Sequence, residues 1–214
     1  MASAPSALLY DWDNTLVDAW GGVTAALNAT FDAFGQPRWT VAETRARVRV
    51  SLRESFPVMF GNDWERARDI FYGTLRQEHL RHVTPMPGVE EALAAGFGRK
   101  QGVVSNKTGA FLRAEVAHLG WSHHFAAVIG AGDAAADKPD PAPILLALEK
   151  LGVAPETHVW YLGDTALDMQ AARAAGVTAV LIGDASHDGG IEHAAPDLHY
   201  TSAHELATRL RALA

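Results

Sequence analysis

The sequence has no cysteine among its 214 residues, no long apolar run and no surplus of positive charge. Without cysteine the chain can form no disulfide, no thiolate nucleophile and no thiolate-ligated zinc or iron–sulfur centre. A bound metal would therefore need Asp, Glu, His or backbone oxygen ligands. With 18 basic and 25 acidic residues the formal charge is -7, which disfavours nucleic acid and anionic membranes as partners.

No apolar segment approaches the roughly 20 residues that a transmembrane helix needs. The first residues, MASAPSALLYD, lack the basic start and the long apolar centre of a secretion signal. We therefore expect a cytoplasmic protein that does not enter a membrane. A hydrophobic fraction of 48% is enough to bury a large core, so the chain is expected to be globular.

Short apolar runs alternate with helical patterns from residue 100 onward. These apolar runs, interpreted as strands, cover residues 102–104, 126–129, 159–162 and 179–182, and residues 7–10 near the N-terminus form a first strand of the same class. The helical patterns cover residues 111–119, 143–151 and 167–175, each followed by a glycine, and a last helix begins at Ser202. This order predicts an α/β fold, with a doubly wound, Rossmann-like parallel sheet covered by helices on both faces.

Residues 18–84 contain no convincing strand, and their pattern is helical throughout. Apolar positions at helical spacing mark three helices, the second of which covers 41–55. We therefore expect an all-helical domain at 18–84, inserted into an α/β core domain made of residues 1–17 and 85–214.

Two acids, Asp11 and Asp13, directly follow the first strand, where open α/β sheets build their sites. Carboxylates this close repel each other unless they share a proton or bind a cation, and oxygen ligands alone favour Mg²⁺. A calcium loop that starts at Asp11 does not fit, because Leu16 and Gly22 stand where glycine and glutamate are required. An alternative interpretation at this point is that these residues form only a turn that caps the next helix.

Three further polar groups follow later apolar runs. Ser105 and Asn106 end the second strand, where a hydroxyl and amide groups suit a phosphate oxygen. Lys138 stands in a turn rich in Pro and Asp. Asp164 and Asp168 lie one helical turn apart after the fourth strand, so their like charges need a cation or Lys138 to offset them. Taken alone, each of these groups is also common in turns or on protein surfaces that have no function.

In this order the four groups resemble the motifs of the haloacid dehalogenase superfamily. The matching segments are DWDNT at 11–15, Ser105, Lys138 and GDTALD at 163–168. The resemblance covers nearly the whole chain, including the helical insertion after the first motif. It looks most like the phosphoglycolate phosphatase and β-phosphoglucomutase branch, with Trp12 where phenylalanine is more usual.

The resemblance implies a mechanism. Asp11 would attack phosphorus and form an aspartyl-phosphate, and Asp13 would protonate the leaving alcohol and then activate water. Mg²⁺ would be held by Asp11, Asp164 and the backbone carbonyl of Asp13, while Asp168 would orient Lys138 or a water on the metal. The phosphoryl oxygens would be held by Thr15, Ser105, Asn106 and Lys138.

The expected function is a Mg²⁺-dependent phosphatase that hydrolyses a small phosphorylated metabolite similar to phosphoglycolate. Dehalogenases of this superfamily lack an acid at the position of Asp13, so the resemblance favours phosphoryl transfer. A sugar phosphomutase uses the same core residues and stays open as an alternative, as does a non-catalytic binding module on the same fold. The oligomeric state is open.

Substrate specificity is expected in the helical cap domain, which in this family closes over the core. Arg45, Arg49 and Arg53 recur at intervals of four, so on one helix they would form a basic stripe able to bind a carboxylate of the substrate. A solvated helix face is the alternative. Four histidines near the C-terminus lack helical metal-binding spacing and are not assigned to a metal: His187, His193, His199 and His204.

Overall fold

The computed structural model describes residues 4–48, 52–156 and 158–213, with the backbone alone for 52–54. The chain divides into two compact units, one made of Met1–Asp18 with Pro85–Ala214 and the other of Ala19–Thr84. The sequence pattern puts the first boundary one residue earlier and the second at the same place. The α/β unit is therefore interrupted in sequence by the helical unit.

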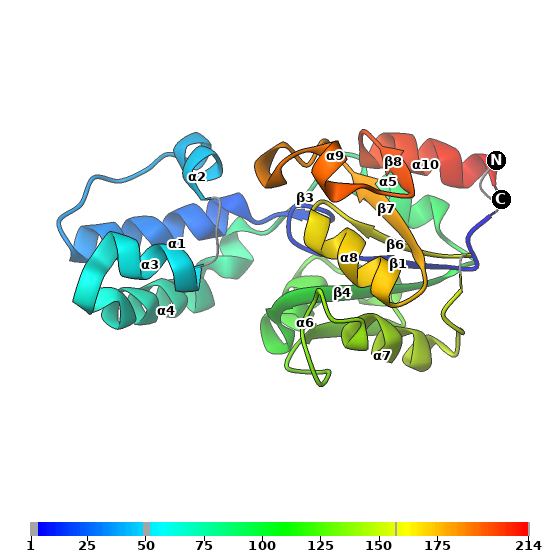
Figure 1. Cartoon of the computed structure of the whole chain (residues 1–214), viewed down its shortest axis with the longest axis horizontal. Helices are drawn as coiled ribbons and strands as arrows, with labels where there is room; N and C mark the ends of the chain where they lie inside the picture. Colours follow the sequence, from blue (N-terminus) through cyan, green and yellow to red (C-terminus); the bar gives the residue numbers. More distant parts are fainter. Residues whose placement is uncertain (1–3, 49–51, 157, 214) are drawn as a thin grey trace. The chain divides into compact units, whose positions relative to one another are not determined.

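A single parallel sheet forms the centre of the α/β unit (Figure 1). Its strands in the described part of the chain are β1 (Ala7–Tyr10), β4 (Lys100–Thr108), β5 (Ala127–Ala131), β6 (Val159–Gly163), β7 (Thr178–Ile182) and β8 (Leu198–Tyr200). They lie in the order β5-β4-β1-β6-β7-β8, and the pairs are parallel. The expected doubly wound α/β sheet is confirmed, with β1 at the point where the winding reverses.

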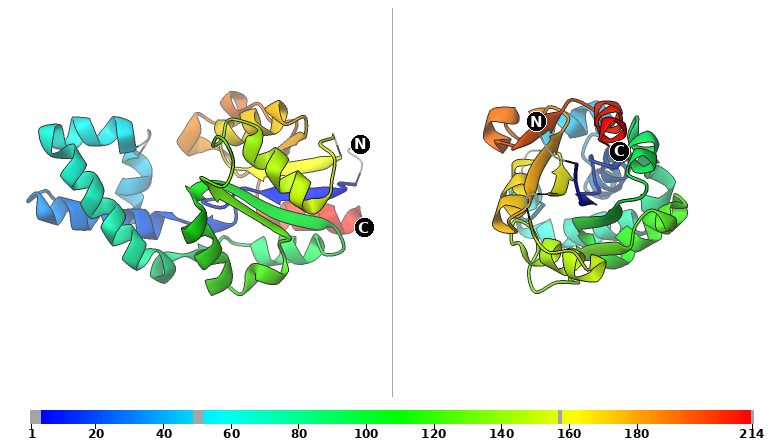
Figure 2. Two further views of the ribbon diagram at one scale, coloured as in Figure 1. Left: turned by 90° about the horizontal axis from the view of Figure 1, so that it is seen from below. Right: turned by 90° about the vertical axis from the view of Figure 1, so that its right-hand side faces the viewer.

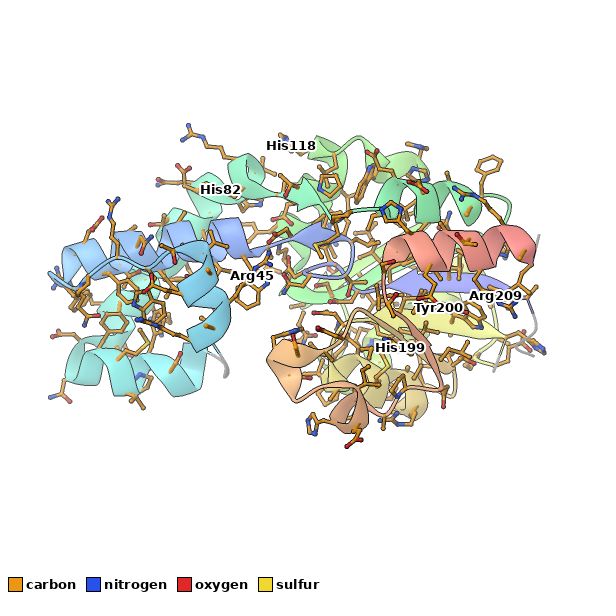
Figure 3. All side chains as sticks on the ribbon, turned by 90° about the horizontal axis from the view of Figure 1, so that it is seen from above. Arg45, His82, His118, His199, Tyr200 and Arg209 are labelled. Carbon is orange, nitrogen blue, oxygen red and sulfur yellow. The ribbon has the colours of Figure 1, made fainter. Side chains whose placement is uncertain are left out.

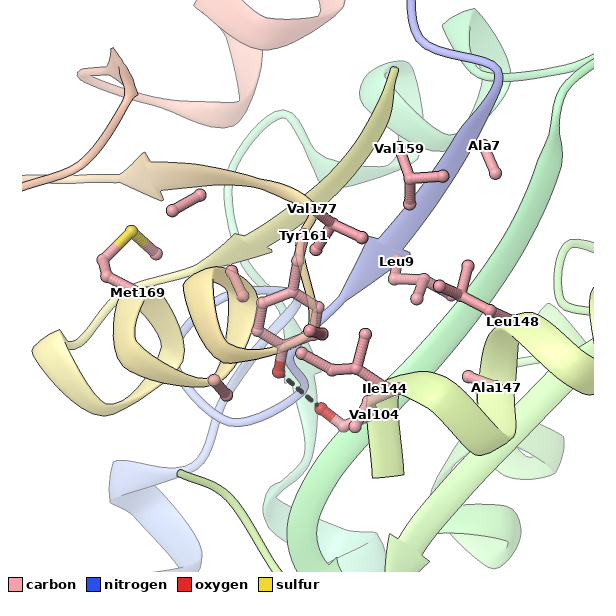
Figure 4. Close-up of a cluster of buried hydrophobic side chains, with 14 of the residues drawn as sticks. Ala7, Leu9, Val104, Ile144, Ala147, Leu148, Val159, Tyr161, Met169 and Val177 are labelled. Carbon is pink, nitrogen blue, oxygen red and sulfur yellow. Dashed lines mark hydrogen bonds between the residues drawn. The ribbon is translucent and has the colours of Figure 1, made fainter. Parts of the chain in front are cut away.

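Helices cover both sides of this sheet (Figure 2). They are α5 (Val89–Ala95), α6 (Gly109–His118), α7 (Ala142–Leu151), α8 (Ala166–Ala174), α9 (Ile191–Ala194) and α10 (Ala203–Ala212), with short 3-10 turns η2 (Trp121–His123) and η3 (Ser186–Asp188). On one face, Ile144 and Leu148 of α7 and Met169 of α8 pack with Leu9 and Tyr161 of the sheet (Figure 4). This buried apolar cluster holds the strands and helices that carry the motifs.

Local signals in the sequence account for several helix ends. Gly152 ends α7 in the left-handed conformation, with φ 61, which a residue without Cβ adopts at little cost. Ser202 caps α10, because its hydroxyl accepts a hydrogen bond from the N–H of Glu205. Helix α5 and strand β8 are absent from the sequence expectations, since seven and three residues are too few for a clear periodic pattern.

The helical unit consists of α1 (Trp20–Ala33), α2 (Val41–Arg47), α3 (Leu52–Phe60), η1 (Gly61–Asp63) and α4 (Trp64–His82). Its core is aromatic: Phe31, Phe56, Phe60 and Phe71 are buried together, with ring centroids of Phe56 and Phe60 5.1 Å apart. The chain enters and leaves this unit through two short strands, β2 (Val17–Asp18) and β3 (Thr84–Pro85), which pair with each other.

The prediction of one continuous helix over 41–55 is wrong. Thr40 and Glu43 form a capping box that starts α2, but Val48 is extended, with φ -77 and ψ 105, so α2 ends at Arg47 and the helix Leu52–Phe60 is a separate element, α3. A β-branched valine is a poor helix residue because its side chain loses rotamer freedom there.

The predicted basic stripe fails with that helix. Arg45 is exposed on α2 (Figure 3), whereas Arg53 belongs to α3. Arg49 and the side chain of Arg53 lie outside the described residues. The three arginines therefore do not share one helix face.

Across the described residues, no helix is both long enough and apolar enough to cross a membrane.

Candidate active site

The motif residues meet at the carboxyl ends of three neighbouring strands. Asp11 follows β1, Ser105 lies on β4 and Asp164 follows β6. Because β1 lies between β4 and β6 and all three strands are parallel, their ends lie at the same edge of the sheet. Lys138 reaches the same place from the loop between β5 and α7, where it is buried. This is the winding-reversal point at which open α/β sheets bind ligands.

A tight loop after β1 presents the first two acids. Asn14 adopts φ 62, a left-handed conformation that asparagine tolerates better than most residues. The backbone carbonyl of Trp12 accepts hydrogen bonds from the N–H groups of Leu16 and Val17, at 2.9 and 3.1 Å. The loop gives the acids different surroundings: Asp11 is buried, whereas the side chain of Asp13 is 32% exposed.

Lys138 binds three side chains at once. Its Nζ donates to Asp11 Oδ1 at 2.6 Å, to Asp168 Oδ1 at 2.7 Å and to the Tyr161 hydroxyl at 2.8 Å. An ammonium group has three N–H donors, so these bonds use all of them. Its main chain is held too, because the Asn106 amide accepts from the Lys138 N–H and donates to the Lys138 carbonyl, both at 2.9 Å. Lys138 is therefore fixed in place.

Asp168 is held in a matching way. Its Oδ2 accepts hydrogen bonds from the backbone N–H and the hydroxyl of Thr165, in the capping box that starts α8. Gly163 makes room for it, since a Cβ at that position would lie 2.3 Å from the Cβ of Asp168. The sequence spacing predicts that a cation, or Lys138, offsets the like charges of Asp164 and Asp168. In the structure Lys138 is the cation that contacts Asp168.

Asp164 lies beside Thr15 and His187. Its Oδ1 accepts a hydrogen bond from the Thr15 hydroxyl at 3.1 Å, and its Oδ2 lies 3.1 Å from Nε2 of His187. Within the described residues, this buried Oδ2 accepts no hydrogen bond of good geometry. The Ser105 hydroxyl accepts from the N–H of Lys107 at 3.2 Å. The phosphate-binding roles of Thr15, Ser105, Asn106 and Lys138 stay predictions.

Comparison with known proteins identifies the family. The model of the family described as haloacid dehalogenase-like hydrolase matches residues 8–182. The chain belongs to this family, as the motifs predict. A phosphoglycolate phosphatase of Xanthomonas campestris pv. campestris is 33% identical over 186 residues, which are 82% of each chain. The expected enzyme class, a phosphatase of this family, is confirmed.

Solved structures share the fold. A haloacid dehalogenase-like family hydrolase from Streptococcus pneumoniae superposes with a TM-score of 0.81 at 23% identity, covering 98% of this chain and 99% of that one. A haloacid dehalogenase-superfamily hydrolase from Geobacter sulfurreducens gives 0.80 at 24% identity, with 98% of each chain covered. At these identities the likeness concerns the fold alone.

The family's divalent metal fits the residues of this site. Carboxylate oxygens of Asp11, Asp164 and Asp168 lie within 4.8 Å of one another, and all three residues are buried. Both oxygens of Asp168 already have partners, whereas the buried Oδ2 of Asp164 is poorly satisfied. A hard cation is bound by such oxygen ligands, and it would satisfy this oxygen. The carboxylate of Asp13 is not part of this cluster of three acids. The backbone carbonyl of Asp13 stays a predicted metal ligand.

The pKa shifts of the site residues also favour binding of a cation. Burial raises the pKa of Asp11 to about 8; the charges of Asp168 and Asp164 act in the same direction, and Lys138 opposes them. Burial also raises the pKa of Asp164. Burial acts to lower the pKa of Lys138, but Asp11 and Asp168 outweigh it and raise that pKa well above its ordinary value. The site therefore carries an excess of buried carboxylates that a second cation would stabilise.

The sequence pattern did not assign three residues near the site, Tyr161, Lys107 and Glu115, and it considered His187 only as a metal ligand, which it did not assign. Tyr161 looked like an ordinary strand residue, but its hydroxyl also donates to the Val104 carbonyl at 2.9 Å (Figure 4). Glu115 could have been noticed, because it is a carboxylate among the apolar positions of α6, between Leu112 and Val116. Nothing in the spacing of His187 points to Asp164.

The raised pKa of Asp11 predicts a pH-dependent cost to stability in the metal-free protein. Between pH about 4 and about 8 the folded state binds more protons at Asp11 than the unfolded state, so stability falls as pH rises. Asp11→Asn removes this group while keeping its shape. At pH 8 we expect the free energy of unfolding of the variant to be higher than that of the wild type by about 1 kcal/mol or more. Each kcal/mol corresponds to a rise of about 2–4 °C in Tm.

The measurement is thermal unfolding in EDTA at pH 5, 6, 7 and 8. The difference between variant and wild type should grow with pH, because other titrating groups are common to both. A difference that is constant with pH, or a less stable variant at pH 8, would contradict the electrostatic reading.

Proposed function

We propose that this chain is a Mg²⁺-dependent phosphatase that hydrolyses a small phosphomonoester through an aspartyl-phosphate on Asp11. The observation that carries the proposal is the placement of Asp11: a buried carboxylate at the end of β1, 2.6 Å from the Lys138 ammonium, with a second, more exposed acid two residues on. A nucleophile next to a fixed positive charge, with an acid nearby, is what a covalent phosphoryl transfer requires.

The two acids have different tasks in this proposal. An oxygen of Asp11 attacks phosphorus, forming an O–P bond as the bond to the leaving alcohol breaks. Asp13 gives its proton to that alcohol, then takes a proton from the water that hydrolyses the acyl phosphate. The partial exposure of Asp13 suits contact with a leaving group, and the burial of Asp11 keeps bulk water from the nucleophile.

Charge stabilisation comes from the residues around Asp11. Lys138 is held by Asp168, Tyr161 and Asn106, so its ammonium is preorganised for the charge on the transferring phosphoryl group. Ser105 on β4 and Thr15 in the loop after β1 are assigned to phosphoryl oxygens. Mg²⁺ held by Asp11, Asp164 and the Asp13 carbonyl would reduce the repulsion between the anionic nucleophile and an anionic phosphate.

For the substrate we propose a phosphoglycolate-like compound, a small phosphomonoester with a second anionic group. Support comes from the relatives named phosphoglycolate phosphatase, among them the one from Xanthomonas campestris pv. campestris. We expect phosphate release from phosphoglycolate and no conversion of β-glucose 1-phosphate to glucose 6-phosphate, with both products measured in one incubation. Conversion of the sugar phosphate without net phosphate release would favour a phosphomutase instead.

Asp11→Asn should abolish hydrolysis of p-nitrophenyl phosphate, with a loss of about 10⁴-fold or more, because an amide is a poor nucleophile. The wild type, quenched during turnover and treated with borohydride, should yield a peptide with homoserine at position 11. Asp69→Asn is the control, because Asp69 is exposed on α4. Unchanged turnover in Asp11→Asn, or a reduced residue elsewhere, would overturn the nucleophile.

Removal of divalent metal should stop turnover, and Mg²⁺ should restore it. Because Asp164 is proposed as a ligand, Asp164→Asn should weaken Mg²⁺ binding by about tenfold or more, measured by calorimetry without substrate. Asp137→Asn is a control for the loss of one acid, since Asp137 is exposed. Activity that is indifferent to both EDTA and Mg²⁺ would refute the metal requirement.

A further inference from the structure

A second lysine lies on the other side of the first motif. Lys107 Nζ donates to Asp13 Oδ1 at 2.7 Å and to Glu115 Oε2 at 2.6 Å. The same Glu115 oxygen accepts a hydrogen bond from the indole N–H of Trp12, also at 2.6 Å. A chain of polar contacts thus runs from Trp12 through Glu115 and Lys107 to Asp13.

Exposure increases along this chain of contacts. Trp12 is fully buried, and the side chains of Glu115, Lys107 and Asp13 are 1%, 15% and 32% exposed. A buried carboxylate is costly unless charged or polar donors satisfy it. Glu115 has two such donors, the Lys107 ammonium and the Trp12 indole, so it is anchored at the buried end. Lys107 is in turn held where it meets the more exposed Asp13.

The charge of Lys107 is secure in this position. Burial acts to lower its pKa, but the nearby carboxylates of Asp13 and Glu115 outweigh burial and raise that pKa above its ordinary value. Lys107 is therefore a cation that presents a fixed N–H donor to Asp13. None of its contacts is with Asp11 or Lys138 in the described part of the chain, so its task differs from that of Lys138.

We propose that Lys107, held by Glu115 and Trp12, is the positioning residue for the acid–base carboxyl of Asp13. The inference rests on the proposed function, in which Asp13 gives a proton to the leaving alcohol. Because Oδ1 accepts the lysine N–H, the transferable proton of Asp13 belongs on Oδ2. Lys107 thus fixes both the rotamer of Asp13 and the oxygen that carries its proton, while taking no part in proton transfer itself.

This role predicts an effect that depends on the leaving group. An alkyl alcohol must be protonated as it leaves, whereas p-nitrophenolate is stable enough to leave without a proton. Lys107→Met should reduce kcat/KM for an alkyl phosphomonoester by about 10²-fold, as expected for a misplaced general acid, but by less than about fivefold for p-nitrophenyl phosphate. Lys107→Arg should recover part of the alkyl activity.

Removing Lys107 alone leaves the buried Glu115 without one of its donors, so the experiment needs a second variant that controls for a folding defect. The double variant Lys107→Met with Glu115→Gln leaves no unpaired charge at the buried end of this chain of contacts, where Glu115 lies, and should show the same split between substrates. Trp12→Phe keeps an aromatic ring but removes the indole donor, and a smaller split is expected. Lys150→Met on α7 is the matched control, since Lys150 is exposed.

Asp13→Asn, assayed with both substrates, separates this inference from the proposed function. A large split in Asp13→Asn with equal losses, or none, in both Lys107 variants would overturn the positioning role alone. No split in Asp13→Asn would overturn the acid role of Asp13 and the positioning role with it. A split in Asp13→Asn and in both Lys107 variants, with partial recovery in Lys107→Arg, supports the proposal.

Discussion

One buried ammonium group holds the site together. Lys138 comes from the loop between β5 and α7, and its three donors meet Asp11 at the end of β1, Tyr161 on β6 and Asp168 on α8. A charge in a medium of low polarity is tolerated only with close, well-aligned partners, and its loss would leave two buried carboxylates unpaired. The relative positions of a loop, two strands and a helix thus depend on the same few hydrogen bonds.

The positive charge of Lys138 alone does not balance the buried carboxylates of the site. Asp11, Asp164 and Asp168 place carboxylate oxygens within 4.8 Å of one another, and Lys138 contacts only Asp11 and Asp168 among these described acids. The pKa of Asp11 is raised to about 8, and a buried oxygen of Asp164 accepts no hydrogen bond of good geometry within the described residues. Such a surplus of carboxylates costs stability in the metal-free protein. It also makes the place suited to a divalent cation, and this is a general reason why binding sites are not optimised for stability.

The loop after β1 places two identical side chains in unlike surroundings. Asp11 points into the buried cluster of Lys138, whereas Asp13 lies at the more exposed end of the chain of contacts through Lys107 and Glu115. Two acids that differ in burial and in their lysine partner can take different tasks, one as nucleophile and one as acid and base. The proposed division of labour therefore follows from surroundings, since the residue type is the same.

The sequence by itself determined the α/β class, most strands and helices of the core, and the four polar groups at strand ends, because periodicity and helix-end signals are local. It misjudged the helix over 41–55, which ends before Val48, and it missed the three-residue strand β8. Only the tertiary structure decided which side chains meet. Trp12 and Glu115 are 103 positions apart and Lys138 and Asp11 are 127 apart, and no local pattern encodes contacts that arise when strands and helices pack.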